Sequence, residues 1–387
     1  MKFAHMGDCH LGGWRQPELK DLNFKSFQRA IDLCITEKVE FILIAGDLFD
    51  SAYPSIETLK DAFKEFRKVA EAKIPVFLIA GSHDYSASGK TFLDVVEKAG
   101  FCKNVALFEE RNGKILLEPT IYKNCALYGY PGKKSGLEVD DIARMGLQDA
   151  PGFYKILMLH TAIRDAVGTL PIKAVDEQML PKVDYLALAH LHIKYNKENR
   201  VYCGPIFPNN LAELEELGGG SFYIVSNGIA RRQEIVLKKV LSLTVETTNA
   251  INVADEIITR LEKEILKDKI VILKLYGFLE KGKTSDIDFT RIESYAKKQG
   301  AYVVLKSTTK LQVAEQEILI DLSDTGDMEL QIIHKFEETH PNPYNLLIFP
   351  LLKSLQIEKG EDEKSLVFEE RLIAEARKII EQENKFS

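Results

Sequence analysis

The sequence predicts an α/β fold of stacked sheets flanked by helices, followed by a small α+β unit and a pair of helices. Apolar runs of strand length alternate with amphipathic helical segments over residues 1–240. At 387 residues the chain is too long for one small core, and its 45% apolar content is too high for a disordered chain. We therefore expect two or three folded domains.

The strands of the first domain are predicted from short runs that are mostly apolar, as is typical of strands covered on both faces. They are Lys2–Met6, Phe41–Ala45, Val76–Ala80, Ala126–Tyr130, Lys155–His160, Asp184–Ala189 and Phe222–Ser226. Two predicted helices, Asn23–Glu37 and Ser55–Glu71, separate the early strands and carry apolar side chains on one stripe. The later strands follow one another more closely, so we expect antiparallel pairing among them.

Residues 241–334 are predicted to form a small α+β domain. In order, we expect a strand at Leu241–Glu246, a helix at Val253–Leu266, a strand at Ile270–Tyr276, a helix at Asp286–Gln299 and a strand at Ala301–Lys306. Pro341 and Pro343 then forbid a continuing helix, which makes residues 335–344 a predicted linker.

Residues 345–387 are predicted to form a helix-loop-helix. Asn345–Ile357 is densely apolar, and Ser365–Asn384 repeats apolar residues at helical spacing. Because such a pair cannot bury its own surface, we expect it to dock on a partner protein. Docking on the body of the same chain is the alternative.

Charge and cysteine content limit the compartment and the partners. The net charge is −7, so a nucleic-acid substrate would have to be bound through local basic patches, metals or a partner. The five cysteines are scattered without a CxxC pair, which indicates reduced and mostly buried thiols. With no signal-peptide core and no apolar run of membrane length, we expect a soluble cytoplasmic protein without a membrane partner.

Chemistry is indicated by short polar motifs, each directly after a predicted strand. They are Asp8-Cys9-His10, Gly46-Asp47, Gly81-Ser82-His83-Asp84, His160 and His190-Leu191-His192. Taken singly each is weak, since an Asp there is usually a turn residue and a lone His is usually a core residue. Together they are informative, because strand ends in α/β sheets converge on one edge.

The residue types suit a pair of divalent cations, which at ~3.5–4 Å apart need a bridging carboxylate and hard or borderline ligands. Asp8 and His10 are two residues apart, so on an extended backbone both would point at one metal, as would His190 and His192. Asp47 is the predicted bridge. Manganese is favoured for this Asp/His set, with iron or zinc as alternatives. His83 is the candidate general acid; the alternative is that it only holds its loop.

These motifs resemble the calcineurin-type metallophosphoesterases, with their pattern DxH, GD, GNH(D/E), H and GHxH. The segments Gly46–Asp50 and Asp184–His192, with Tyr202–Pro205 behind, are similar to the archaeal form of the SbcD-like, meiotic-recombination-eleven-type nuclease of double-strand-break repair. The resemblance implies a four-layer αββα sandwich with a capping domain and ATPase-docking helices. It also implies a homodimeric, nucleoid-associated nuclease with two Mn²⁺ per chain. This enzyme would act on DNA ends with 3′→5′ exonuclease and single-strand endonuclease activity, together with an SMC-like coiled-coil ATPase.

The resemblance further implies the role of each motif residue. One metal would take Asp8, His10, Asp47 and His192, and the other Asp47, Ser82, His160 and His190, with His83 as the transition-state histidine. Ser82 stands where the family usually has Asn, so the second metal is expected to be held more weakly or through a bridging water. Asp50 replaces a His of many relatives and is a candidate to assist catalysis. Ala189 replaces a Gly.

Other signals leave alternatives open. Trp14, Arg15 and Lys90 are candidate nucleic-acid contacts, although Trp14 could equally pack its own loop. Gly277–Thr284 matches a phosphate loop, but its bulky, acidic interior favours chance. The alternative function is another two-metal phosphodiesterase, acting on cyclic nucleotides or small phosphodiesters. A decayed, non-enzymatic scaffold is a third hypothesis, which the near-complete ligand set disfavours.

Overall fold

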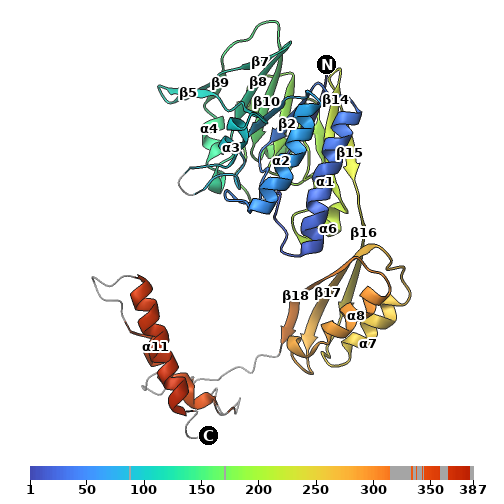
Figure 1. The fold of residues 1–387 in the computed structure, drawn as a ribbon, viewed down its shortest axis with the longest axis vertical. Coiled ribbons are helices and arrows are strands. Elements are labelled where there is room, and N and C mark those ends of the chain that lie inside the picture. The colour runs from blue at the N-terminus through green and yellow to red at the C-terminus, as the bar shows by residue number, and fades with distance from the viewer. Residues whose placement is uncertain are drawn as a thin grey trace. The chain divides into compact units, whose positions relative to one another are not determined.

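The computed structural model describes residues 1–86, 89–169, 171–313, 344–357 and 365–383, together with residues 333, 337 and 342. The chain divides into two compact units, Met1–Val313 and Ala314–Ser387, which are described separately (Figure 1). The predicted linker and the end of the predicted 241–334 domain fall mostly outside the described residues.

The first sheet has the strand order β15-β14-β1-β2-β3-β4. Its strands are β1 (Lys2–Met6), β2 (Phe41–Ala45), β3 (Val76–Ile79), β4 (Lys103–Asn104), β14 (Gly220–Ser226) and β15 (Ile229–Ile235). Helices α1 (Pro17–Thr36) and α2 (Ile56–Glu71) connect β1, β2 and β3, which are parallel, while α3 (Leu93–Lys98) precedes β4. Helix α1 begins six residues before the predicted Asn23, because Pro17 suits the first turn of a helix.

The second sheet has the order β12-β13-β11-β10-β8-β7. Its strands are β7 (Thr120–Tyr122), β8 (Cys125–Tyr130), β10 (Tyr154–His160), β11 (Tyr185–Ala189), β12 (Tyr195–Lys197) and β13 (Arg200–Tyr202). The expected antiparallel pairing is wrong for the centre of this sheet, where β8, β10, β11 and β13 are parallel. The loops between these strands are long enough for parallel crossovers, and only the edge pairs β7–β8 and β12–β13 are antiparallel.

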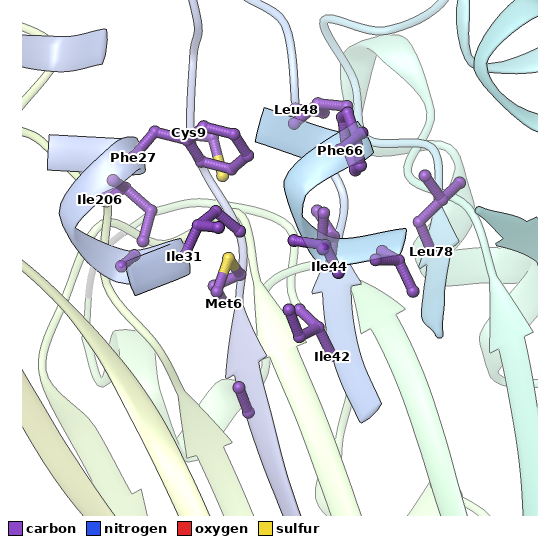
Figure 2. Packing of buried hydrophobic residues seen from close by; sticks show 14 of the residues in the cluster. Met6, Cys9, Phe27, Ile31, Ile42, Ile44, Leu48, Phe66, Leu78 and Ile206 are labelled. Atoms are coloured by element: carbon purple, nitrogen blue, oxygen red, sulfur yellow. The ribbon is translucent and has the colours of Figure 1, made fainter. Parts of the chain in front are cut away.

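Three apolar layers hold the sheets and helices together in an α/β sandwich. One lies between α1, α2 and the first sheet, where Phe27, Ile44 and Phe66 are buried (Figure 2). The second lies between the two sheets and includes Phe3, stacked on Phe41 with ring centroids 4.9 Å apart. The third covers the outer face of the second sheet. The predicted class of helices flanking stacked sheets is confirmed.

A small three-stranded sheet, which the sequence analysis did not predict, lies between β4 and β10 in the chain. It comprises β5 (Phe108–Arg111), β6 (Lys114–Leu117) and β9 (Met145–Leu147). The short helices α4 (Glu138–Ile142) and α5 (Arg164–Val167) lie in the crossovers to β10 and β11. Strand β5 has the sequence Phe-Glu-Glu-Arg and is exposed at every residue. It could not be predicted, because an exposed strand needs no apolar run.

The next segment forms a three-stranded sheet, called here the cap sheet, of β16 (Lys239–Glu246), β17 (Lys269–Leu279) and β18 (Val303–Val313). All pairs are parallel, and α7 (Val253–Leu261) and α8 (Phe289–Lys298) pack on one face. The opposite face packs through Ile270, Ile272 and Leu305 against α1 and α6 (Leu211–Leu217). The phosphate-loop match is a chance resemblance, because Gly277–Leu279 lie within β17 and pair with Leu311–Val313.

The second unit contains a 3₁₀ turn (Asn345–Leu347) and helices α10 (Ile348–Leu355) and α11 (Ser365–Glu383). The single predicted helix at Asn345–Ile357 is therefore divided, and Pro350 lies in the first turn of α10, where a missing N–H is tolerated. Leu346, Phe349 and Leu355 are exposed. Among the described residues, no helix combines the length and apolarity needed to cross a membrane.

Candidate metal centre

The motif residues lie at or just beyond the strand ends, and four of them have positive φ. The φ angles are 46° at Asp8, 41° at His10, 48° at Asp47 and 96° at His190. The expectation that Asp8 and His10 converge because they share one side of an extended strand is therefore wrong. The turn is held instead by hydrogen bonds from the backbone N–H groups of Cys9 and His10 to the Asp47 carbonyl. Left-handed backbone at non-glycine residues is strained and concentrates at functional sites.

Asp8, His10 and His192 form one group of potential ligands. The Nε2 atoms of His10 and His192 are 3.2 Å apart, and His192 Nε2 lies 3.9 Å from Asp8 Oδ1. Asp8 is fully buried and His10 is 2% exposed. The backbone N–H of His190 donates to both Asp8 oxygens at 3.0 Å, which fixes the carboxylate across 182 residues of chain.

Asp8, Asp47 and His160 form a second group. Asp47 Oδ2 lies 3.1 Å from His160 Nε2 and 3.7 Å from His10 Nε2, so this one oxygen faces ligands of both groups. Burial would lower the pKa of His160, but the Asp47 carboxylate outweighs it and raises the pKa to about 10. Burial would likewise raise the pKa of Asp47, and the His160 charge lowers it instead. A cation here would have to displace a proton from His160.

His190 and Ser82 lie beside the second group. The His190 ring is 5.0 Å from the His160 ring, between centroids, and burial together with the His160 charge lowers the pKa of His190 to about 4. A neutral imidazole is the form that binds metals. Ser82 Oγ donates to Asp47 Oδ2 over a long 3.4 Å. The structure therefore brings together all seven predicted ligands.

The Nδ1 atom of each of three histidines is held from outside the two groups. His10 Nδ1 bonds Asp50 Oδ1 at 3.1 Å, and His160 Nδ1 bonds the Ala45 carbonyl at 3.0 Å. His192 Nδ1 bonds Glu213 Oε2 at 2.9 Å. Such outer partners fix the tautomer that leaves Nε2 free for a metal. Sequence reasoning missed Glu213, which lies in a short helix outside every motif.

These features fit a divalent cation pair. With both Nδ1 atoms donating to carboxylates, the Nε2 lone pairs of His10 and His192 face each other, an arrangement that a cation satisfies. His160 Nε2 is buried and, despite its closeness to Asp47, makes no hydrogen bond of good geometry. A buried nitrogen without a partner is costly unless another group binds it.

Asp84 and two glycines shape the loops around the centre. The buried Asp84 carboxylate accepts the backbone N–H groups of Leu48, Phe49 and Gly81. Burial and the nearby Asp47 charge raise the pKa of Asp84 to about 6. A Cβ at Gly81 would lie 2.2 Å from Asp47 Oδ1, and one at Gly46 would lie 2.4 Å from His160 Nδ1. Only glycine allows these approaches.

His83 stands at the open side of the centre, 47% exposed. Its Nδ1 bonds the Asp50 carbonyl at 2.9 Å, and its ring meets the His10 ring edge-on at 4.8 Å. This leaves Nε2 as the ring nitrogen available to a substrate. An open pocket of about 480 Å³ begins here, lined by Asp50, Tyr53, His83, Tyr85 and Lys134 among others.

The three candidate nucleic-acid contacts differ in their surroundings, because one is packed within the protein and two are exposed. The Trp14 indole N–H donates to the Pro208 carbonyl at 2.8 Å, and its ring packs edge-on against Phe207 beside the cap sheet. These contacts agree with the alternative that Trp14 packs its own loop. Arg15 and Lys90 are exposed. Lys134, by contrast, lines the pocket beside His83.

Residues 1–194, which contain every ligand candidate, match the family described as calcineurin-like phosphoesterases. The chain belongs to this family. DNA double-strand break repair protein Mre11 of Archaeoglobus fulgidus is 24% identical, over 100% of this chain and 91% of the relative. The Mre11 of Methanocaldococcus jannaschii is 23% identical, over 92% of this chain and 94% of the relative.

A further member of similar sequence is the uncharacterized metallophosphoesterase YhaO of Bacillus subtilis. It is 30% identical over 58% of this chain and 57% of the relative. The matches to the Mre11 proteins of Archaeoglobus fulgidus and Methanocaldococcus jannaschii, unlike this one, extend beyond the phosphoesterase region to nearly the whole chain. The resemblance to the meiotic-recombination-eleven type of calcineurin-like phosphoesterase is thus confirmed.

Proposed function

We propose that this calcineurin-like phosphoesterase is a manganese-dependent DNA nuclease that processes DNA ends in double-strand-break repair. It would combine 3′→5′ exonuclease with single-strand endonuclease activity. The observation that carries the proposal is that the Nε2 atoms of His10 and His160 both face Asp47 Oδ2. The similarity to an archaeal Mre11 protein over the whole chain supports DNA as the substrate.

Each motif residue has a proposed role. Asp8, His10, Asp47 and His192 would hold one Mn²⁺, and Asp47, Ser82, His160 and His190 the other, with Asp47 shared. When bound, two such cations neutralise charge on phosphoryl oxygens and activate water for in-line displacement. Asp50 orients His10 through its side chain and His83 through its carbonyl. His83 then donates a proton from Nε2 to the leaving oxygen.

The pocket beside His83 would receive the nucleotide. Tyr53 and Tyr85 offer faces on which a base can stack, and Lys134 offers a charge for a phosphate. Local groups of this kind are needed because the chain as a whole carries a net charge of −7. We propose that the exposed Arg15 and Lys90 also contact DNA. Trp14 is not proposed as a DNA contact, because its side chain packs within its own loop.

The test is cleavage of labelled single- and double-stranded DNA by the full chain, with Mn²⁺, Mg²⁺ or a chelator. We expect cleavage in Mn²⁺ that the chelator abolishes and that Asp8→Ala reduces to background. Full Mn²⁺-dependent cleavage by Asp8→Ala would point to a contaminating nuclease or a different centre. Cyclic nucleotides are assayed in parallel, and their faster hydrolysis would favour the alternative of a small-phosphodiester hydrolase.

We further propose the domain roles and partners. Residues 1–240 would form the nuclease, 241–334 the cap, 335–344 a linker and 345–387 a helix-loop-helix that docks an SMC-like coiled-coil ATPase. The exposed apolar side chains of α10 support this docking. We also propose a nucleoid-associated homodimer in the cytoplasm. Ile56, which is 79% exposed at the start of α2, is a candidate for its interface.

A further inference from the structure

The two predicted ligand histidines of one metal, His10 and His192, are oriented from a single short segment, residues 209–213. Asn209 Nδ2 donates to Asp50 Oδ1 at 3.2 Å, and the same oxygen accepts from His10 Nδ1. Glu213 Oε2 accepts from His192 Nδ1 at 2.9 Å and from the Asn209 backbone N–H at 2.8 Å. Both imidazoles of the Asp8, His10 and His192 group thus depend on this segment. His160 does not, because its Nδ1 is held by the Ala45 carbonyl.

This segment continues into α6, which the cap sheet holds from the other side. Glu215 bonds Lys274 of β17 at 2.6 and 2.7 Å and accepts from Ser242 Oγ of β16 at 2.7 Å. Leu214, 1% exposed, packs among Ile270, Ile272 and Leu305 of the cap sheet. Glu213 and Glu215 therefore point to opposite sides of α6. Glu213 contacts the ligand candidate His192, and Glu215 contacts Lys274 of the cap sheet.

We propose that α6 transmits the position of the cap sheet to one of the two metal positions, with Glu213 and Asn209 as positioning residues for His192 and His10. The inference rests on the proposed two-metal function and deepens it. A shift of the cap sheet moves α6 through its apolar contacts and through Glu215. The shift then changes how well the two imidazoles converge, while the Asp47 and His160 position is unaffected.

The physical reason is that outer hydrogen bonds determine how well a histidine is pre-oriented. Losing such a partner typically weakens metal binding about 10–100-fold. Lys274 contacts Glu215 of α6 and no ligand histidine, so it acts only through the position of α6. Its loss should therefore weaken metal binding less than the loss of Glu213. The two positions should respond differently, because only one of them is oriented from residues 209–213.

The first experiment measures Mn²⁺ binding to the full chain by calorimetry, where the two positions appear as two binding steps. We expect Glu213→Ala to weaken one step about 10–100-fold and leave the other unchanged. Glu213→Gln keeps an oxygen that accepts from His192, and should restore most of the affinity. Equal weakening of both steps, or a lower melting temperature with unchanged binding, would overturn the proposal.

The second experiment tests the cap side with a matched pair of lysines. Lys274→Met removes the ion pair to Glu215, and we expect it to weaken the same binding step severalfold. Lys306→Met removes an ion pair of the same sheet to Glu293 of α8, on the face away from α6, and should leave both steps unchanged. Identical binding by the wild type and Lys274→Met would contradict a role for the cap.

Mn²⁺-dependent DNA cleavage by the wild type is measured alongside. Two normal binding steps without DNA cleavage would refute the proposed nuclease while leaving the role of α6 standing. If the wild type cleaves DNA but both Glu213 variants bind Mn²⁺ as the wild type does, the role of α6 would be refuted while the proposed nuclease would stand.

Discussion

At the scale of single residues, the centre depends on which nitrogen of each imidazole faces inward. His10, His160 and His192 are each held at Nδ1 by an oxygen outside the centre, so that Nε2 faces the carboxylates. His83 is also held at Nδ1, but its ring is half exposed and lies over the pocket. In the proposed mechanism one residue type would supply both metal ligands and a proton donor, and the position of the ring would decide between these roles.

His83→Ala is expected to lower the rate of DNA cleavage about 10²–10⁴-fold, because a positioned proton donor contributes that much to such reactions. His83 also lies within ligand distance of His10 and Asp50. Because its Nδ1 is held by the Asp50 carbonyl and it is not one of the proposed ligands, we expect Mn²⁺ affinity to stay close to that of the wild type. Single-turnover cleavage and calorimetry on the same preparation check the two statements. A parallel loss of affinity would assign His83 to metal binding instead.

Ser82→Asn is expected to tighten binding of the second Mn²⁺. An amide oxygen is a better ligand than a hydroxyl, and Ser82 makes only a 3.4 Å contact with Asp47. Calorimetry should show one binding step improved and the other unchanged. Ser86→Asn, four residues further along the same loop between β3 and α3, is the matched control. An unchanged second step in Ser82→Asn would mean that position 82 does not contact the metal.

Asp141 should make stability depend on acid pH. Burial opposes its charge, but hydrogen bonds from Lys133, Arg144 and Tyr130 lower its pKa to about 2. Because this folded pKa lies below the unfolded value, the stabilisation is complete above about pH 4 and is lost as the pH falls towards 2. After allowance for the half-exposed cations it is about 1–2 kcal/mol. Urea unfolding of Asp141→Asn should show this deficit at pH 7 and a smaller one at pH 3; a deficit independent of pH would contradict the assignment.

At the scale of elements, the loops after parallel strands carry the chemistry because tertiary contacts hold them in conformations that their sequences disfavour. The loop after β1 bonds the loop after β2 through the Asp47 carbonyl, and Asp84 joins the loop after β3 to the loop after β2. Helix α6 adds a third support through Glu213. The ligands are therefore positioned by loops that stabilise one another.

Asp84→Ala is expected to destabilise the fold by about 3 kcal/mol, because it leaves three buried backbone N–H groups without an acceptor. Denaturation in urea measures the loss. Asp94→Ala, at an exposed acid on α3, is the matched control and should change stability by less than about 0.5 kcal/mol. Equal stability of the Asp84 variant and the wild type would show that water replaces the carboxylate.

At the scale of the whole molecule, the first unit is built so that the cap sheet and the catalytic body share an apolar interface. Leu19 and Leu22 of α1 meet Ile270 and Ile272 of β17 there, with Tyr302 donating to the Glu18 carbonyl. The cap sheet is thus packed directly against the element that follows the Asp8–His10 loop. The second unit has its own helix pair with exposed apolar side chains.

Deleting residues 345–387 is expected to leave the fold and Mn²⁺-dependent cleavage largely intact and to abolish pairing with the ATPase. The reason is that this segment belongs to the second unit, whereas all ligand candidates lie in the first. Size-exclusion chromatography with the purified ATPase, and DNA cleavage by the truncated chain, measure the two effects. Normal pairing after truncation would contradict the docking proposal. Phe349→Asp in the full chain is a milder test of the same surface.

Although it did not predict short strands such as β5, β6 and β9, the sequence by itself determined the longer apolar strands, most helix positions and the set of candidate ligand types. These follow from local patterns: short apolar runs such as Phe41–Ala45, the 3.6-residue stripe of α2, and polar motifs directly after strands. The convergence of those motifs could be predicted, because strand ends in such sheets meet at one edge.

Only the tertiary structure decided the parallel pairing of β8, β10, β11 and β13, the positive φ at Asp8 and His10, and the placement of Trp14 beside the cap sheet. It also revealed Glu213 behind His192. The physical reason is that contacts between residues far apart in the chain decide these features, as when His190 fixes Asp8 across 182 residues. No local pattern encodes which distant group will satisfy a buried carboxylate or orient an imidazole.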